Sequence, residues 1–169
     1  MNKPPYADET FRDFLDRLRS EKELVDIKQP VDSRHIATLV DQADKALLFH
    51  KVIGYKMPVV SGIIRSQKRA IMSMGCNTYP EIEFRLQHGI ENPIAPKYIE
   101  KTPVKEVIQL GGDVDLFSLP IPMFSIYDGG PMITAGITIA KDPEFGLNSG
   151  IYRFMVKEKN LTGIDIVTP

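Results

Sequence analysis

The chain has 169 residues, of which 43% are hydrophobic and 25% are charged, a composition typical of globular proteins. Its formal net charge is −1 and its lysines and arginines are scattered, so there is no electrostatic basis for binding nucleic acid or an anionic membrane. No apolar stretch approaches the roughly 20 residues that a bilayer-spanning helix needs, and the single cysteine, Cys76, indicates a reducing, cytoplasmic setting.

Helical and strand-like patterns alternate through the first 103 residues. Thr10 and Asp13 have the spacing of a capping box, and an apolar face with helical periodicity follows them. Further helices are predicted to begin at Ser33, at Ser66 and at Thr78, the last as a second capping box with Glu81. Short strands are predicted at 23–27, 47–49 and 58–64. This mixture predicts an α/β or α+β domain over residues 1–103.

Residues 104–169 have the pattern of a β-meander. Alternation at 104–108 predicts extended chain, and strands are predicted at 133–140, 149–157 and 161–167. Turns are expected at 141–146 and 159–160. Three strands leave both outer edges of a sheet open. We therefore expect an incomplete sheet that a further segment or a partner chain completes.

The strand at 149–157 carries one cation between apolar residues. Alternation places Ile151, Arg153 and Met155 on one face and Tyr152 on the other. If both faces are covered, the guanidinium of Arg153 is buried and needs an anionic partner. If the hairpin is exposed, the stem of Arg153 instead covers Met155 and its charge stays in water. The strand pattern leaves both alternatives open.

Two loop positions have a structural and a functional interpretation. Asn148 precedes the strand, where an asparagine usually bonds turn backbone but could also offer an amide oxygen to Mg²⁺ or Mn²⁺. Gly129 and Gly130 follow Asp128, and they permit a ligand to approach the backbone closely or simply form a surface loop. The three histidines have no second ligand at metal-binding spacing and are expected to be structural.

Several segments together resemble the N-terminal part of UbiD-type decarboxylases. The resemblance covers most of the chain and is strongest at 115–120, at 128–136 and in the run Asn148-Ser149-Gly150-Ile151-Tyr152-Arg153. It implies that residues 104–169 are the first strands of a split β-barrel of flavin-reductase type, which holds prenylated FMN. The implied enzyme is a carboxy-lyase acting on an aromatic or α,β-unsaturated carboxylic acid, a small molecule. The cofactor would supply the difficult chemistry and the protein would orient it.

The resemblance also implies roles for individual residues. Asn148 would bind a divalent metal, Mn²⁺ or Mg²⁺, that bridges to the cofactor phosphate, with K⁺ as a further candidate ion. Ile151, Tyr152 and Arg153 would contact the cofactor. Arg153 would also be catalytic, as the centre of a Glu-Arg-Glu ionic network that sets the protonation of the catalytic Glu.

The family's other functional groups follow later in the sequence than residue 169. They are a metal-binding His, a metal-binding Glu and the proton-donating Glu, while Asp165 lies where some relatives have a basic, cofactor-contacting segment. We therefore expect an N-terminal piece or a split subunit, inactive by itself. It would work as a homo-oligomer or with a second chain that carries the missing His and Glu residues. The alternatives are a non-catalytic partner subunit and a small FMN-binding module.

Overall fold

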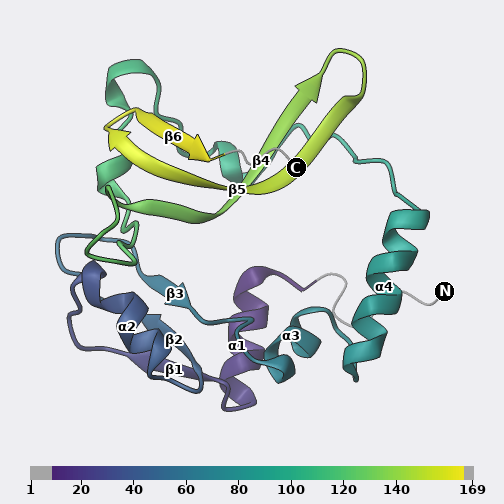
Figure 1. Cartoon of the computed structure of the whole chain (residues 1–169), viewed down its shortest axis with the longest axis horizontal. Coiled ribbons are helices and arrows are strands. Elements are labelled where there is room, and N and C mark those ends of the chain that lie inside the picture. Colours follow the sequence, from purple (N-terminus) through teal and green to yellow (C-terminus); the bar gives the residue numbers. More distant parts are fainter. Residues whose placement is uncertain (1–8, 166–169) are drawn as a thin grey trace. The chain divides into compact units, whose positions relative to one another are not determined.

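The computed structural model describes residues 9–165 of the chain. These residues form a mixed α/β structure with two three-stranded sheets (Figure 1). The chain divides into two compact units. The first contains the described residues up to Ile27, Val40–Phe49 and Val60–Ile108, and the second contains Lys28–Leu39, His50–Val59 and the described residues from Gln109 onward. Among the described residues, no helix is long and apolar enough to cross a membrane.

The predicted capping box begins the first helix, α1 (Phe11–Ser20). The backbone N–H of Asp13 donates to the Thr10 hydroxyl at 3.2 Å, and the N–H of Thr10 donates to the Asp13 carboxylate at 2.9 Å. Two backbone N–H groups at the start of the helix, which have no partner within it, are thereby satisfied. Phe14 and Leu18 are buried one turn apart, as the apolar periodicity predicted.

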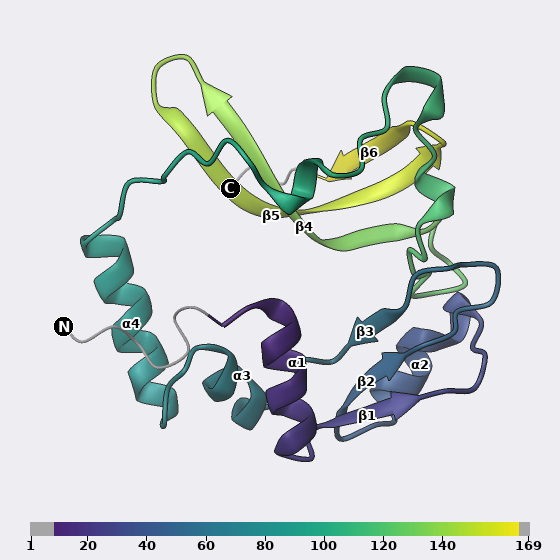
Figure 2. The same ribbon diagram turned by 180° about the vertical axis from the view of Figure 1, so that it is seen from behind.

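The first sheet forms beside this helix. Strands β1 (Leu24–Ile27) and β2 (Ala46–Phe49) pair in parallel, and β3 (Val59–Ser61) completes the order β1-β2-β3. All three predicted strands are confirmed, with slightly different ends. Helices α1 and α3 (Gln67–Ser73) lie side by side in both views (Figure 1, Figure 2). The core of this unit consists of Phe14, Leu18, Leu24 and Ala46, with Leu15, Leu48, Val60, Ile63 and Met72 packed against it.

A buried arginine joins these elements. Arg69, on α3, is only 2% exposed. Its guanidinium donates to the Glu23 carboxylate at 3.0 Å, to the carbonyl oxygen of Asp44 at 2.8 Å and to that of Gly62 at 3.0 Å. Every acceptor lies in a different loop or strand end, so one side chain connects the start of β1, the entry to β2 and the exit of β3. The sequence patterns gave no sign of this network.

Three predicted features differ from the structure for local reasons. Asp32, not Ser33, caps a 3₁₀ turn at Ser33–His35, and α2 (Ile36–Asp41) begins after it. Helix α4 (Tyr79–Glu91) begins directly after Thr78, as predicted, but the capping box is absent: Thr78 makes no side-chain cap hydrogen bond, and the Glu81 carboxylate accepts from the N–H of Asn77. Residues 104–108 form no strand, since Pro103 starts a 3₁₀ turn at Pro103–Lys105.

The second unit contains the antiparallel sheet β4 (Met132–Asp142), β5 (Gly146–Glu158) and β6 (Leu161–Asp165), in the order β4-β5-β6. The β4–β5 hairpin is longer than predicted because pairing continues to Asp142 and Gly146. The Asp142 carboxylate closes the turn by accepting from the N–H groups of Glu144 and Phe145, both at 2.8 Å. The last predicted strand is confirmed to Asp165, and its residues 166–167 lie outside the described part of the chain.

Both ladders of this sheet contain a bulge. In β4 the pairing moves from Ile133 opposite Phe154 to Gly136 opposite Tyr152, so β4 carries one extra residue. In β5 the pairing moves from Val156 opposite Thr162 to Glu158 opposite Leu161, so Lys157 is the extra residue. Two 3₁₀ turns, Gly111–Asp113 and Leu116–Ser118, precede the sheet, and the N–H of Leu116 donates to the carbonyl oxygen of Lys159 at 2.7 Å.

A candidate cofactor-binding strand

Asn148 lies inside strand β5, where it pairs with Ala140. The interpretation of Asn148 as a turn residue is therefore wrong, because the hairpin turn ends before Gly146. The side chain is exposed and makes no hydrogen bond within residues 9–165. Its amide oxygen is consequently available to a ligand, although one amide oxygen cannot hold a metal ion alone.

The predicted site residues divide between the two faces of β5. The bulge opposite residues 152–154 adds its extra residue to β4 and none to β5, so the side chains of β5 alternate between its two faces from Gly146 to Met155. Ile151 and Arg153 share one face, and Asn148 and Tyr152 share the other. The ring of Tyr152 lies over Gly150, where an added Cβ would stand 2.7 Å from a ring carbon. Gly150 is therefore required by the position of Tyr152.

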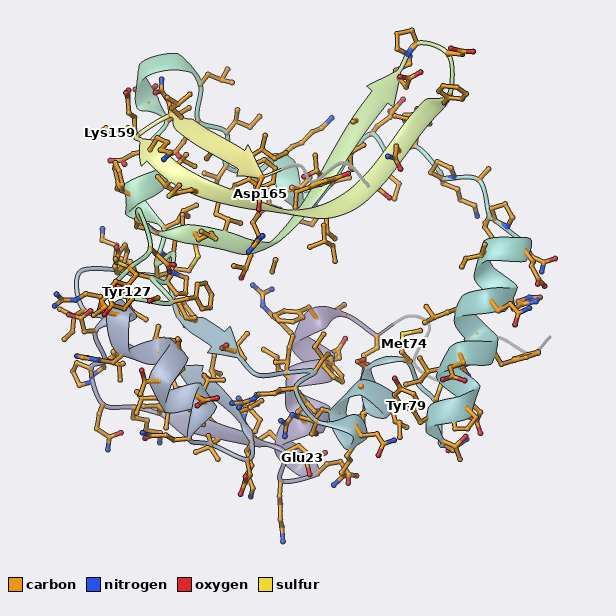
Figure 3. All side chains as sticks on the ribbon, in the orientation of Figure 1. Glu23, Met74, Tyr79, Tyr127, Lys159 and Asp165 are labelled. Carbon is orange, nitrogen blue, oxygen red and sulfur yellow. The ribbon has the colours of Figure 1, made fainter. Side chains whose placement is uncertain are left out.

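Arg153 is exposed and forms an ion pair. Its side chain is 62% exposed, and one terminal nitrogen donates to the Asp165 carboxylate at 2.6 Å. The two residues stand directly opposite each other on β5 and β6, and Figure 3 labels Asp165 at the end of β6. Of the two alternatives for Arg153, the exposed hairpin holds in the described chain. The anionic partner that a buried arginine would need is nevertheless present.

A shallow hollow of about 280 Å³ lies beside this ion pair. Its wall is mostly apolar and is formed by Met132, Arg153, Met155, Gly163, Ile164 and Asp165. Binding sites for whole small molecules usually occupy roughly 300–1,000 Å³. At about 280 Å³ the hollow lies just below this range, and it is not large enough to enclose a complete cofactor.

The double glycine packs closely against β5. A Cβ on Gly129 would lie 3.0 Å from the Met155 sulfur, and one on Gly130 would lie 3.2 Å from the carbonyl oxygen of Val156. Asp128 stabilises its own loop by accepting from the N–H groups of Phe124 and Ser125, at 3.1 and 2.8 Å. The loop interpretation of this segment is thus the one that the structure favours.

The described residues contain no group of three or more His, Cys, Asp or Glu side chains that could hold a metal ion. His88 stacks on Phe84 with ring centroids 6.3 Å apart, and its ring nitrogen lies 3.1 Å from the side-chain amide nitrogen of Asn92. A metal at Asn148 would therefore need ligands from outside the described residues.

Comparison with known proteins decides the family. Residues 15–86 match the model of the 3-octaprenyl-4-hydroxybenzoate carboxy-lyase N-terminal domain, and residues 97–169 match that of the Rift-related domain of the same enzymes. The two domains occur in family order and together cover most of the chain. This chain belongs to the UbiD family.

Solved structures of UbiD-class enzymes have the same fold as this UbiD-family chain. A dimeric form of HmfF from Pelotomaculum thermopropionicum, in complex with prenylated FMN, is 35% identical, with a TM-score of 0.85 over 92% of this chain and 38% of that one. Vanillic acid decarboxylase of Sedimentibacter hydroxybenzoicus is 30% identical, with a TM-score of 0.81 over 92% of this chain and 38% of that one. The predicted mixed α/β architecture is thereby confirmed.

Anhydromevalonate phosphate decarboxylase of Methanothermobacter thermautotrophicus is 30% identical over 92% of this chain and 36% of its own length. The UbiD-family chain therefore spans about a third of the length of the curated relatives that it matches.

Sequence reasoning did not place Met132 or Asp165 beside Arg153 at the hollow. Each is placed there by a bulge, which adds one residue to a strand and shifts every later pairing. Bulges leave little trace in an alternating pattern. The resemblance had drawn attention to Asp165, but not to its pairing with Arg153.

Proposed function

We propose that this chain is the N-terminal part of a UbiD-type decarboxylase that acts reversibly on an aromatic or α,β-unsaturated carboxylic acid. The observation that carries the proposal is the match to both family domains in order, with the run 148–153 on β5 beside an exposed hollow. In the proposed domain division, residues 1–103 are an α/β domain. Residues 104–169 then begin a split β-barrel of flavin-reductase type.

Prenylated FMN is the proposed cofactor, supported by its presence in the HmfF complex that is 35% identical to this chain. When bound, it supplies the electron sink for loss of CO₂. Ile151 and Arg153 would contact it on one face of β5, and Asn148 and Tyr152 on the other.

Asn148 is proposed to ligate the divalent ion, Mn²⁺ or Mg²⁺, that neutralises the cofactor phosphate, with K⁺ as a further candidate. An amide oxygen suits these hard cations. Arg153 is proposed to pair, through its remaining N–H donors, with two glutamates of the complete enzyme, and so to set the protonation of the catalytic Glu. Because a general acid and the other metal ligands are required, the chain alone is expected to be inactive.

The missing groups would come from further residues of the same polypeptide or from a second chain, and the complete enzyme is proposed to be a homo-oligomer in the cytoplasm. The DNA after the Pro169 codon separates these cases. An open frame with a His and two Glu at family spacing indicates one polypeptide. A stop codon directs the search to a copurifying protein that bears those residues.

Decarboxylation assays test the proposal itself. The 169-residue chain and the completed enzyme are each loaded with prenylated FMN and Mn²⁺ and given a panel of hydroxybenzoic and acrylic acids, with CO₂ release as the readout. We expect turnover from the completed enzyme and none from the chain alone. Turnover by the chain alone contradicts the proposed division of the site, and an inactive completed enzyme that binds the cofactor contradicts the proposed reaction.

A further inference from the structure

The ion pair between Arg153 and Asp165 joins two exposed side chains of neighbouring strands β5 and β6. Both residues project onto the same face, directly opposite in register, with the nitrogen and oxygen 2.6 Å apart. They are the two charged residues among the six that line the hollow. Asp165 thus pairs with Arg153 in a wall whose other lining residues carry no charge.

The register that makes this contact is created by the bulge at Lys157. A tight turn after Glu158 with regular pairing would place Asp165 opposite Phe154, with its side chain on the other face. The extra residue in β5 moves Asp165 opposite Arg153. The bulge therefore has a local consequence at the candidate site: it brings a carboxylate to the guanidinium.

The ion pair limits the conformations of the Arg153 side chain but does not use all of its N–H donors. A guanidinium has five N–H donors, and Asp165 accepts from one nitrogen. The other donors remain for further acidic groups. An exposed ion pair adds little to stability, but it limits an arginine side chain that otherwise samples many rotamers.

We infer that Asp165 is a positioning residue of this site, which holds the Arg153 guanidinium at the hollow and leaves its remaining donors to the acidic residues of the complete enzyme. The inference rests on the proposed function for the catalytic role of Arg153, whereas the ion pair itself does not depend on that role.

The first test measures the reactivity of Arg153 in the 169-residue chain. Phenylglyoxal attacks free guanidinium groups, and peptide mass spectrometry gives the modification rate at Arg153 separately. The variants are Asp165→Asn, Asp165→Glu and, as a matched control, Glu158→Gln. Glu158 is exposed at the end of β5 and has no ion-pair partner among the described residues, so its variant removes one negative charge elsewhere on the strand.

Asp165→Asn is expected to speed modification of Arg153 by up to about fivefold, the factor set by a weak exposed ion pair. Asp165→Glu should restore the slow rate, and Glu158→Gln should leave it unchanged. The melting temperature should move by no more than about 3 °C in any variant. An unchanged rate in Asp165→Asn, or equal acceleration in Asp165→Asn and Glu158→Gln, overturns the inference.

The second test uses the completed decarboxylase. Asp165→Asn is expected to lower kcat by about tenfold with little change in KM, the pattern of a misplaced group acting in the transition state, and Asp165→Glu should recover most of it. Loss of turnover in Arg153→Lys with full turnover in Asp165→Asn overturns the positioning role. Full turnover in both variants overturns the proposed role of Arg153 and the positioning role with it, while the reactivity test still reports on the ion pair.

Discussion

The Arg69 guanidinium lies 3.0 Å from the Glu23 carboxylate, and Arg69 is almost completely buried. Glu23→Gln leaves that buried charge without an anion, which we expect to destabilise the first unit by about 3 kcal/mol. Lys68→Met is the matched control, because Lys68 also pairs with Glu23, at 2.8 Å, but is 55% exposed. Its cost should stay below about 1 kcal/mol. Urea unfolding followed by circular dichroism measures both, and equal losses would contradict the proposed asymmetry.

The same carboxylate predicts a dependence of stability on pH. Hydrogen bonds from Lys68 and then Arg69 lower the pKa of Glu23 below its usual 4.5. A lowered folded-state pKa contributes stability that is complete above the unfolded pKa and is lost as pH falls through the folded pKa. Between pH 6 and pH 3 the wild-type chain should therefore lose more unfolding free energy than Glu23→Gln. Parallel pH profiles for the two proteins would contradict this prediction.

The two predicted capping boxes should differ in their energetic importance. Thr10→Ala removes a hydroxyl that accepts from Asp13 and is expected to cost about 1 kcal/mol. Thr78 makes no cap hydrogen bond, so Thr78→Ala should change stability by less than about 0.5 kcal/mol. Thermal unfolding of the two variants measures the difference. A cost at Thr78 as large as that at Thr10 would show that the Thr78 hydroxyl caps α4 in solution.

Gly130 is predicted to be intolerant of a side chain. A Cβ at this position would stand 3.2 Å from the carbonyl oxygen of Val156, which belongs to the strand backbone and cannot rotate away. Gly130→Ala should therefore cost about 1–3 kcal/mol. Gly112→Ala, in open space, is the control and should be neutral. Amide hydrogen exchange at Val156, whose N–H donates to Pro131, would report the loss locally; unchanged protection would contradict the prediction.

Asn148 is predicted to contribute to metal binding and not to the stability of the folded chain. Its exposed side chain makes no hydrogen bond within the described residues, so Asn148→Ala should change the stability of the chain by less than about 0.5 kcal/mol. In the completed enzyme the same variant should lose bound Mn²⁺, because one of few oxygen ligands is removed. Elemental analysis after desalting measures the metal, and full retention would remove Asn148 from the ligand set.

The elements that sequence reasoning located correctly depend on local chemistry. The capping box of α1 involves residues three apart, and the alternation of β5 is visible in the strand itself. One local pattern gave a wrong prediction. Residues 104–108 alternate like a strand, but the fixed backbone angle of Pro103 starts a 3₁₀ turn at this place.

The contacts that sequence reasoning missed depend on residues far apart in the chain. Arg69 meets a carboxylate 46 residues away and a carbonyl group 25 residues away, and nothing in the helical pattern around Arg69 specifies either contact. The pairing of Arg153 with Asp165 depends on a bulge at Lys157. If the pairing from the turn at 159–160 were regular, Asp165 would stand opposite Phe154, with its side chain on the face away from Arg153. The family resemblance supplied the candidate residues, and their division between two faces required coordinates.

The bulge in β4 sets which way Met132 faces. Without the extra residue between Ile133 and Gly136, Met132 would stand opposite Val156, with its thioether on the face away from Arg153; with it, Met132 stands opposite Met155 and lines the hollow. Deleting a single residue at 134 or 135 would thus turn the side chains of Met132 and Ile133 to the opposite faces of the sheet. Such a deletion would remove the Met132 thioether from the wall of the hollow. The wall would change although every residue of the 148–153 run stayed the same.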